Sequence, residues 1–169
     1  MIRTKWAVVV TAVIALGAAG CGSGTGAGAK SGPVSPRPEG TGPLAREVVQ
    51  TDIDTSAAAA GAPATDPDWR KVGEESASGL CVVSFRGFFT EAIPADLARF
   101  DDTVRELGRR DWKDAGKKTQ KKDKKGKVYE SRVLLEQRGW RIVAEYQEIH
   151  GTLGLTAFDT ACAQEQGLG

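Results

Sequence analysis

The chain of 169 residues contains no asparagine and one histidine, His150. Ser-His-Asp and Cys-His-Asn sites both need a histidine, so either arrangement would depend on His150 alone. A glycine follows His150, which favours a turn and a solvated side chain. No serine lies in a Gly-x-Ser-x-Gly motif, and ligands for zinc are too few. We therefore expect no catalytic residues, no metal and no cofactor, and we predict that the protein is not an enzyme.

A long apolar run is also missing. The main apolar stretch extends only from Trp6 to Leu16, whereas a membrane-spanning helix needs about 20 residues. It follows Arg3 and Lys5, and the small residues 17–20 separate it from Cys21. A basic start, a short apolar stretch and small residues are together typical of a secretory signal.

The small residues before Cys21 resemble the lipobox of bacterial lipoproteins, although Ala18 stands where that motif usually has leucine. The resemblance implies that residues 1–20 are a signal peptide and that the Cys21 thiol takes a diacylglycerol, with palmitate-type acyl chains. Two acyl chains anchor a protein stably in a membrane, whereas one chain binds the membrane only reversibly. A signal cleaved near Ala19 with Cys21 free, or an uncleaved anchor, are the alternatives. In composition the chain also resembles small lipoproteins of high-GC actinobacteria. The implied location is the extracytoplasmic face of the cell membrane.

The residues after Cys21 have the composition of a linker. Residues 22–42 are mostly Gly, Ser, Pro and Thr, and they offer too little apolar surface to offset the entropy of ordering. Residues 44–49 could form a turn or two of helix, but residues 57–63 return to Ala, Gly and Pro. We expect a flexible tether over 21–65, with a reach of roughly 35–40 Å. One small extracytoplasmic domain is expected over 66–169.

Periodicity within 66–169 predicts an α+β fold. Residues 80–86, 129–135, 140–147 and 153–159 have the alternation of strands, and a short strand is plausible near Trp112. Residues 94–107 have one apolar stripe at helical spacing, with Pro94 at the first position and Gly108 at the end. We expect a single helix packed on a four- to five-stranded antiparallel sheet.

Cys81 and Cys162 remain as a pair once Cys21 is lipidated. Export to an oxidising compartment favours a disulfide between them, and closing a loop of this length stabilises a fold by about 4–5 kcal/mol. Two buried free thiols are the alternative. The sequence lacks the Cys-x-x-Cys spacing that would favour redox activity. The bond predicts that the first and last strands are antiparallel neighbours. Cys162 has the opposite parity to Leu155 and Ala157, so the last strand must end or bulge before it.

Charge is balanced overall but concentrated in one segment. The formal net charge is +1, which argues against a nucleic-acid partner. Between two expected strands, however, residues 117–127 contain one aspartate and seven lysines: Lys117, Lys118, Lys121, Lys122, Lys124, Lys125 and Lys127. We expect a mobile, exposed loop. It is either only solvated or contacts an anionic lipid or cell-wall polymer weakly, without a fixed ligand.

The aromatic doublet Phe88-Phe89 follows the first strand. Alternation directs Phe89 inward and leaves Phe88 on the opposite face. Either the segment near Trp69 covers Phe88, or Phe88 is an exposed aromatic residue on a binding surface.

Three functions are compatible with these features. The favoured one is a membrane-anchored, non-catalytic binding or accessory module of the cell envelope, whose protein partner the sequence does not identify. A structural envelope component would need a large apolar patch or an open sheet edge. A membrane-attached enzyme would need converging carboxylates or His150 in a cleft.

Overall fold

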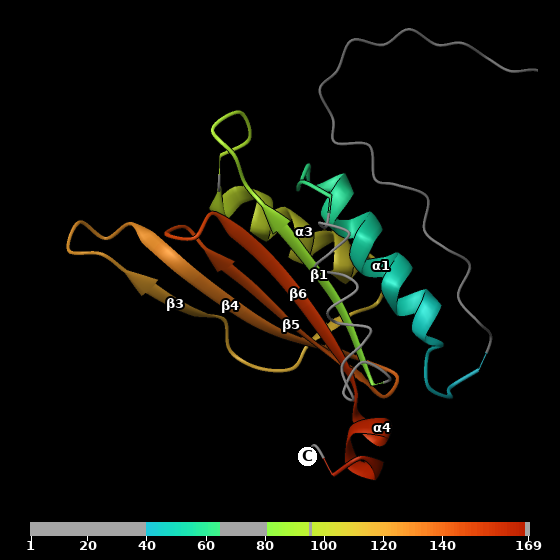
Figure 1. Ribbon diagram of the computed structural model, residues 1–169. Helices are drawn as coiled ribbons and strands as arrows, with labels where there is room; N and C mark the ends of the chain where they lie inside the picture. The colour runs from blue at the N-terminus through green and yellow to red at the C-terminus, as the bar shows by residue number, and fades with distance from the viewer. Residues whose placement is uncertain (1–39, 65–80, 95, 168–169) are drawn as a thin grey trace, which may run out of the picture.

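Six strands form one antiparallel sheet, and helices α1 and α3 cover one of its faces (Figure 1). The computed structural model describes residues 40–64, 81–94 and 96–167. The expected signal peptide, Cys21 and residues 66–80 lie outside this part. The elements are α1 (Arg46–Ala59), β1 (Val82–Phe88), α3 (Leu97–Arg109), β2 (Lys113–Asp114), β3 (Thr119–Lys122), β4 (Val128–Gln137), β5 (Trp140–Gln147), β6 (Thr152–Asp159) and α4 (Thr160–Glu165). The expected α+β class with an antiparallel sheet is confirmed.

The strand order is β1-β6-β5-β4-β2, and β3 also pairs with β4. The first and last strands are antiparallel neighbours, with Val83 opposite Ala157 and Phe85 opposite Leu155. The sheet therefore has one strand more than the upper end of the expected range. Strand β2 is the short strand expected near Trp112, and β3 is the one that was not expected. Both are short and fully exposed, so no burial pattern marks β3.

Alternation sets the two faces of the sheet. In β5, Trp140, Ile142, Ala144 and Tyr146 are buried, and the residues between them are partly or fully exposed. A tight turn joins β4 to β5, with φ of 42° at Arg138 and 84° at Gly139. Two successive positive φ values match the twist of a hairpin, and glycine adopts the second without steric penalty. The bounds of β5 and the turn at 138–139 agree with the sequence prediction.

Helix α1 corrects the expected tether. Residues 44–59 belong to the domain, because Val49, Ile53 and Ala57 are fully buried in the core and Leu44 is nearly so. Two hydrogen bonds of the Leu44 backbone secure the entry to this helix: the Leu44 amide donates to the Arg138 carbonyl at 3.3 Å, and the side-chain Nε1 of Trp140 donates to the Leu44 carbonyl at 2.8 Å. The fold therefore has two helices on the sheet where the sequence predicted one.

Helix α3 begins later and ends later than the sequence predicts. Asp96 is its N-cap, and its carboxylate accepts a hydrogen bond from the Ala98 amide at 2.9 Å. This cap satisfies an amide that has no partner within the helix, which explains a start at Leu97 and not at Pro94. Gly108 lies inside the last turn. Phe100 and Leu107 are buried, whereas Leu97 and Val104 pack at the margin of the core.

A buried polar cluster joins the two helices. Asp52 of α1 and Arg110, just after α3, are both almost fully buried, with 3.8 Å between Arg110 Nη1 and Asp52 Oδ1. Trp112 Nε1 donates to Asp52 Oδ2 at 3.0 Å. A carboxylate buried in the interior needs such partners, because its desolvation is otherwise unfavourable.

A disulfide joins the start of β1 to the C-terminal helix. The Cα atoms of Cys81 and Cys162 are 5.4 Å apart, and the bond closes a sequence separation of 81 residues. Cys162 lies in α4 and not on a strand, which explains its parity: β6 ends at Asp159, whose side chain caps α4 at the Ala161 and Cys162 amides. Within the described part of the chain, no helix has the length and apolarity needed to cross a membrane.

Replacing Ile53 by alanine should lower the free energy of unfolding by about 2–5 kcal/mol, because it leaves a cavity in a fully buried site. Urea denaturation of the oxidised protein measures the change. Glu47→Ala, on the exposed side of the same helix, is the matched control and should stay within about 1 kcal/mol. Equal effects of the two variants would show that α1 belongs to the tether and not to the folded domain.

Replacing both Cys81 and Cys162 by alanine should destabilise the domain by about 4 kcal/mol, because the unfolded chain regains the entropy that the closed loop removed. Thermal or urea unfolding, with and without reductant, provides the measurement. Reductant should destabilise the native protein and leave the double variant unchanged. A native protein indifferent to reductant would contradict this account.

Candidate binding surfaces

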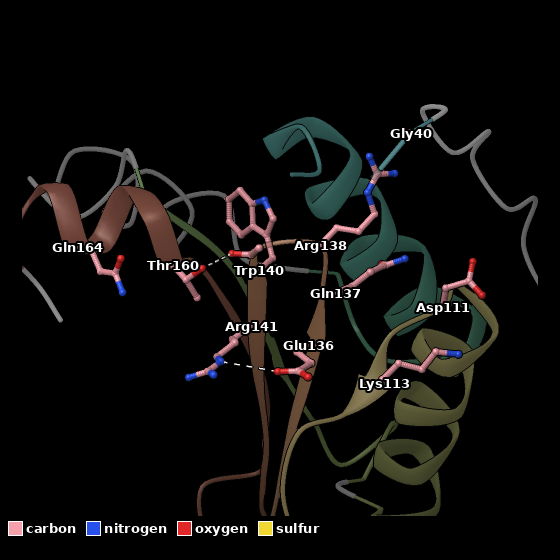
Figure 2. Close-up of a pocket in the computed structure, with 11 residues that line it drawn as sticks. Gly40, Asp111, Lys113, Glu136, Gln137, Arg138, Trp140, Arg141, Thr160 and Gln164 are labelled. Atoms are coloured by element: carbon pink, nitrogen blue, oxygen red, sulfur yellow. Dashed lines mark hydrogen bonds and ion pairs between the residues drawn. The ribbon is translucent and has the colours of Figure 1, made fainter. Parts of the chain in front are cut away.

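A polar groove lies at the end of the sheet where the chain enters the domain. Its volume is about 990 Å³, and its walls are the β4–β5 turn, the segment after α3, and α4 (Figure 2). We refer to this end, which carries Gly40, residues 138–139 and α4, as the entry end. The volume falls in the range of small-molecule sites in proteins.

The groove carries charges of both signs. Lys113, Arg138 and Arg141 supply cations, and Asp111 and Glu136 supply carboxylates. Arg141 and Glu136 point toward one another across neighbouring strands, with 3.9 Å between Nε and Oε2 (Figure 2). Both side chains are more than half exposed, so this pair contributes little to stability.

Hydrogen bonds to the β4–β5 turn fix the position of two groove residues. Thr160 donates to the Gly139 carbonyl twice, from its amide at 2.9 Å and from its hydroxyl at 2.7 Å. Arg138 Nε donates to the Gly42 carbonyl at 2.6 Å. Gln137 Oε1, which is shielded from solvent, has no hydrogen-bond partner among the residues that the structure describes. A groove with fixed hydrogen-bonding groups and with charged side chains of both signs suits a polar ligand. These groups do not define one chemical reaction.

The lysine-rich segment is a β-hairpin and not the expected loop. Residues 119–122 form β3 on β4, and all residues from 117 to 127 are exposed, as expected. Asp123 shapes the turn: its carboxylate accepts from the Lys125 amide at 2.8 Å and from the Lys127 amide at 2.9 Å. Gly126, at φ 84°, completes a three-residue hairpin loop.

Three of the seven lysines are held by carboxylates. Lys118 pairs with Asp101 at 2.6 Å, Lys121 with Glu130 at 2.9 Å, and Lys127 with Glu148. Hydrogen bonds to Glu130 and Glu148 raise the pKa of Lys121 and Lys127 above the ordinary value. The other four, Lys117, Lys122, Lys124 and Lys125, have no ion pair or side-chain hydrogen bond within the described residues. They are therefore available to an external anion.

Phe88 is 44 % exposed. The segment near Trp69, the expected alternative cover, lies outside the described residues, so an exposed aromatic residue at position 88 stays a prediction. Phe89 packs against the core, as alternation predicts. Three further large apolar residues are exposed, namely Ile93, Ile149 and Phe158. Sequence reasoning did not identify these three. The signal for Ile149 was present, since it precedes His150-Gly151 in an expected turn.

The expected lack of a metal site and of catalytic residues remains a prediction. His150 lies exposed in the β5–β6 turn, as predicted for it. Over residues 40–64, 81–94 and 96–167, no group of three or more His, Cys, Asp or Glu side chains is arranged to hold a metal. Burial raises the pKa of Tyr146, which lies against Phe100 in the core. Its phenol therefore stays protonated and belongs to the packing, not to a site.

The groove was not anticipated from the sequence. Its walls come from residues that are far apart along the chain, and only the turn at 138–139 has a local signal. Comparison with models of protein families, with curated proteins and with solved structures finds no match for this chain.

Proposed function

We propose that this chain is a membrane-anchored extracytoplasmic lipoprotein whose folded domain is a non-catalytic binding or accessory module of the cell envelope. The observation that carries the proposal is the order of residues before Cys21: basic, apolar, small and then cysteine. Acyl chains on Cys21 would hold the domain at the membrane without a spanning helix.

Two features of the domain support this location. The Cys81–Cys162 disulfide suits an oxidising compartment outside the cytoplasm. Helix α1 begins at Arg46, so residues 22–42, which have linker composition, separate it from the proposed anchor. A chain of this length would keep the domain within a few nanometres of the bilayer.

The groove at the entry end is the candidate for the binding role. It combines fixed hydrogen-bonding groups with charges of both signs, which suits a polar ligand such as a peptide or a saccharide-containing polymer of the envelope. Gly40 lines this groove, so residues 21–40 would keep the groove within about 65 Å of the bilayer, in the envelope layer next to the membrane.

Replacing Cys21 by serine should abolish acylation and release the protein from the membrane fraction, because the thiol is the proposed acceptor. Intact mass of the membrane-extracted wild type should show loss of residues 1–20 and added acyl mass. The double variant Cys81→Ala/Cys162→Ala is the control, and it should keep the acyl mass. An unmodified Cys21 in the wild type, or an intact leader, would contradict the proposal.

A further inference from the structure

The end of the sheet opposite the groove carries exposed apolar residues beside lysines. Three turns lie at this end: residues 89–93 after β1, residues 123–127 between β3 and β4, and residues 148–151 between β5 and β6. We call this the distal end. Ile149 is 76 % exposed at the tip of its turn, Phe88 is 44 % exposed and Ile93 is 37 % exposed.

Hydrogen bonds and an ion pair connect these turns to one another. The Phe89 amide donates to the Gly151 carbonyl at 2.7 Å, and the Glu148 amide donates to the Tyr129 carbonyl at 2.9 Å. Lys127 pairs with Glu148, the residue before Ile149. These contacts connect the β5–β6 turn to both of the other turns, so the three turns form a row along the end of the sheet.

The charge of the distal end is asymmetric. Lys122, Lys124 and Lys125 have no ion-pair partner within the described part of the chain, whereas Glu130 and Glu148 are paired with lysines and Asp123 accepts from turn amides. Glu91, in the turn after β1, and Asp96, the N-cap of α3, are exposed carboxylates on the other side. The free positive charge lies on the hairpin, next to the most exposed apolar residue.

We propose that the distal end docks on an anionic phospholipid bilayer, with Ile149 and Phe88 entering the interface and Lys122, Lys124 and Lys125 facing the headgroups. Apolar side chains on projecting turns bury area in the headgroup region, and each nearby lysine adds electrostatic attraction to anionic lipid. Salt weakens the second contribution and not the first. A pocket beside Ile149 has a volume of about 110 Å³. That volume is well below the roughly 300 Å³ at which ligand sites begin, so a bilayer fits this end better than an anchor residue of a protein partner.

The proposal rests on the proposed anchor, and the chain is long enough to permit it. Residues 21–40 could extend to about 65 Å. The longest strand, β4, has ten residues and spans about 33 Å. The chain could therefore run from the bilayer along the domain to Gly40 while the distal end touches the same surface. In that orientation the groove points away from the membrane.

Co-sedimentation with vesicles tests the proposal on the mature chain, residues 21–169, carrying Cys21→Ser so that no lipid is attached. Vesicles of phosphatidylglycerol and phosphatidylcholine are compared with vesicles of phosphatidylcholine alone. We expect binding to the anionic vesicles only. Ile149→Ser should weaken it about tenfold at low and at high salt, because it removes apolar insertion. Lys124→Gln/Lys125→Gln should weaken it by about tenfold or more at low salt, and much less at high salt.

Two variants at the entry end are matched controls. Phe158 is 38 % exposed at the other end of β6, and Lys113 is exposed in β2. Phe158→Ser and Lys113→Gln should leave binding within about twofold. A thermal melt of each variant ensures that lost binding is not lost folding.

Docking at the distal end would be overturned by equal binding to neutral and anionic vesicles, by no loss with Ile149→Ser, or by an equal loss with the entry-end controls. An unchanged Ile149→Ser variant would assign these apolar residues to a protein partner. Acyl mass on Cys21 is measured separately. If the wild type is acylated but its unlipidated mature chain does not bind vesicles, the docking alone is overturned. If the mature chain binds vesicles but the wild type is not acylated, the anchor alone is overturned.

Discussion

The architecture follows from a sheet with one apolar face, which must be covered across its whole width. Five neighbouring strands at about 4.8 Å spacing extend about 19 Å, and one helix is about 10 Å across. Two helices are therefore needed, and α1 and α3 meet this requirement. Contacts between them are polar as well as apolar: Asp52 joins Trp112 and Arg110, and Arg99 donates to the Gly61 carbonyl at 2.8 Å. Without α1, part of the β1 and β6 surface would lie open.

Local patterns predicted the elements whose burial alternates cleanly. The bounds of β5 were correct, and the neighbouring β6 and the stripe of α3 were correct to within a few residues. Pairing of Cys81 with Cys162 followed from their count and the expected compartment. Helix α1 was missed because its buried face includes Asp52 and Ser56 beside Val49, Ile53 and Ala57, which blurs the apolar stripe. Only tertiary contacts, with Trp112 above all, make burial of that carboxylate favourable.

The candidate surfaces were predictable only in part. The lysine segment was correctly expected to be exposed, but its like charge argued for a loop. It is a hairpin because Asp123 and Gly126 supply the turn. Carboxylates of Glu130 and Glu148 also pair with Lys121 and Lys127. The Asp-x-x-Gly spacing was the available signal. The groove depends on three segments that meet only in the fold, so no local pattern could predict it. Ile149 became informative only when the structure showed which turns share its end of the sheet.

Gly40 and Gln164 line the same groove, so the described chain enters and leaves the domain at one end. A domain with adjacent ends resembles a module that can be inserted in a loop of another protein, or circularly permuted, without rerouting its strands. The turns at the far end carry neither Gly40 nor Gly167, so insertions there would change the surface that the module presents while the disulfide and the two-helix layer keep its framework.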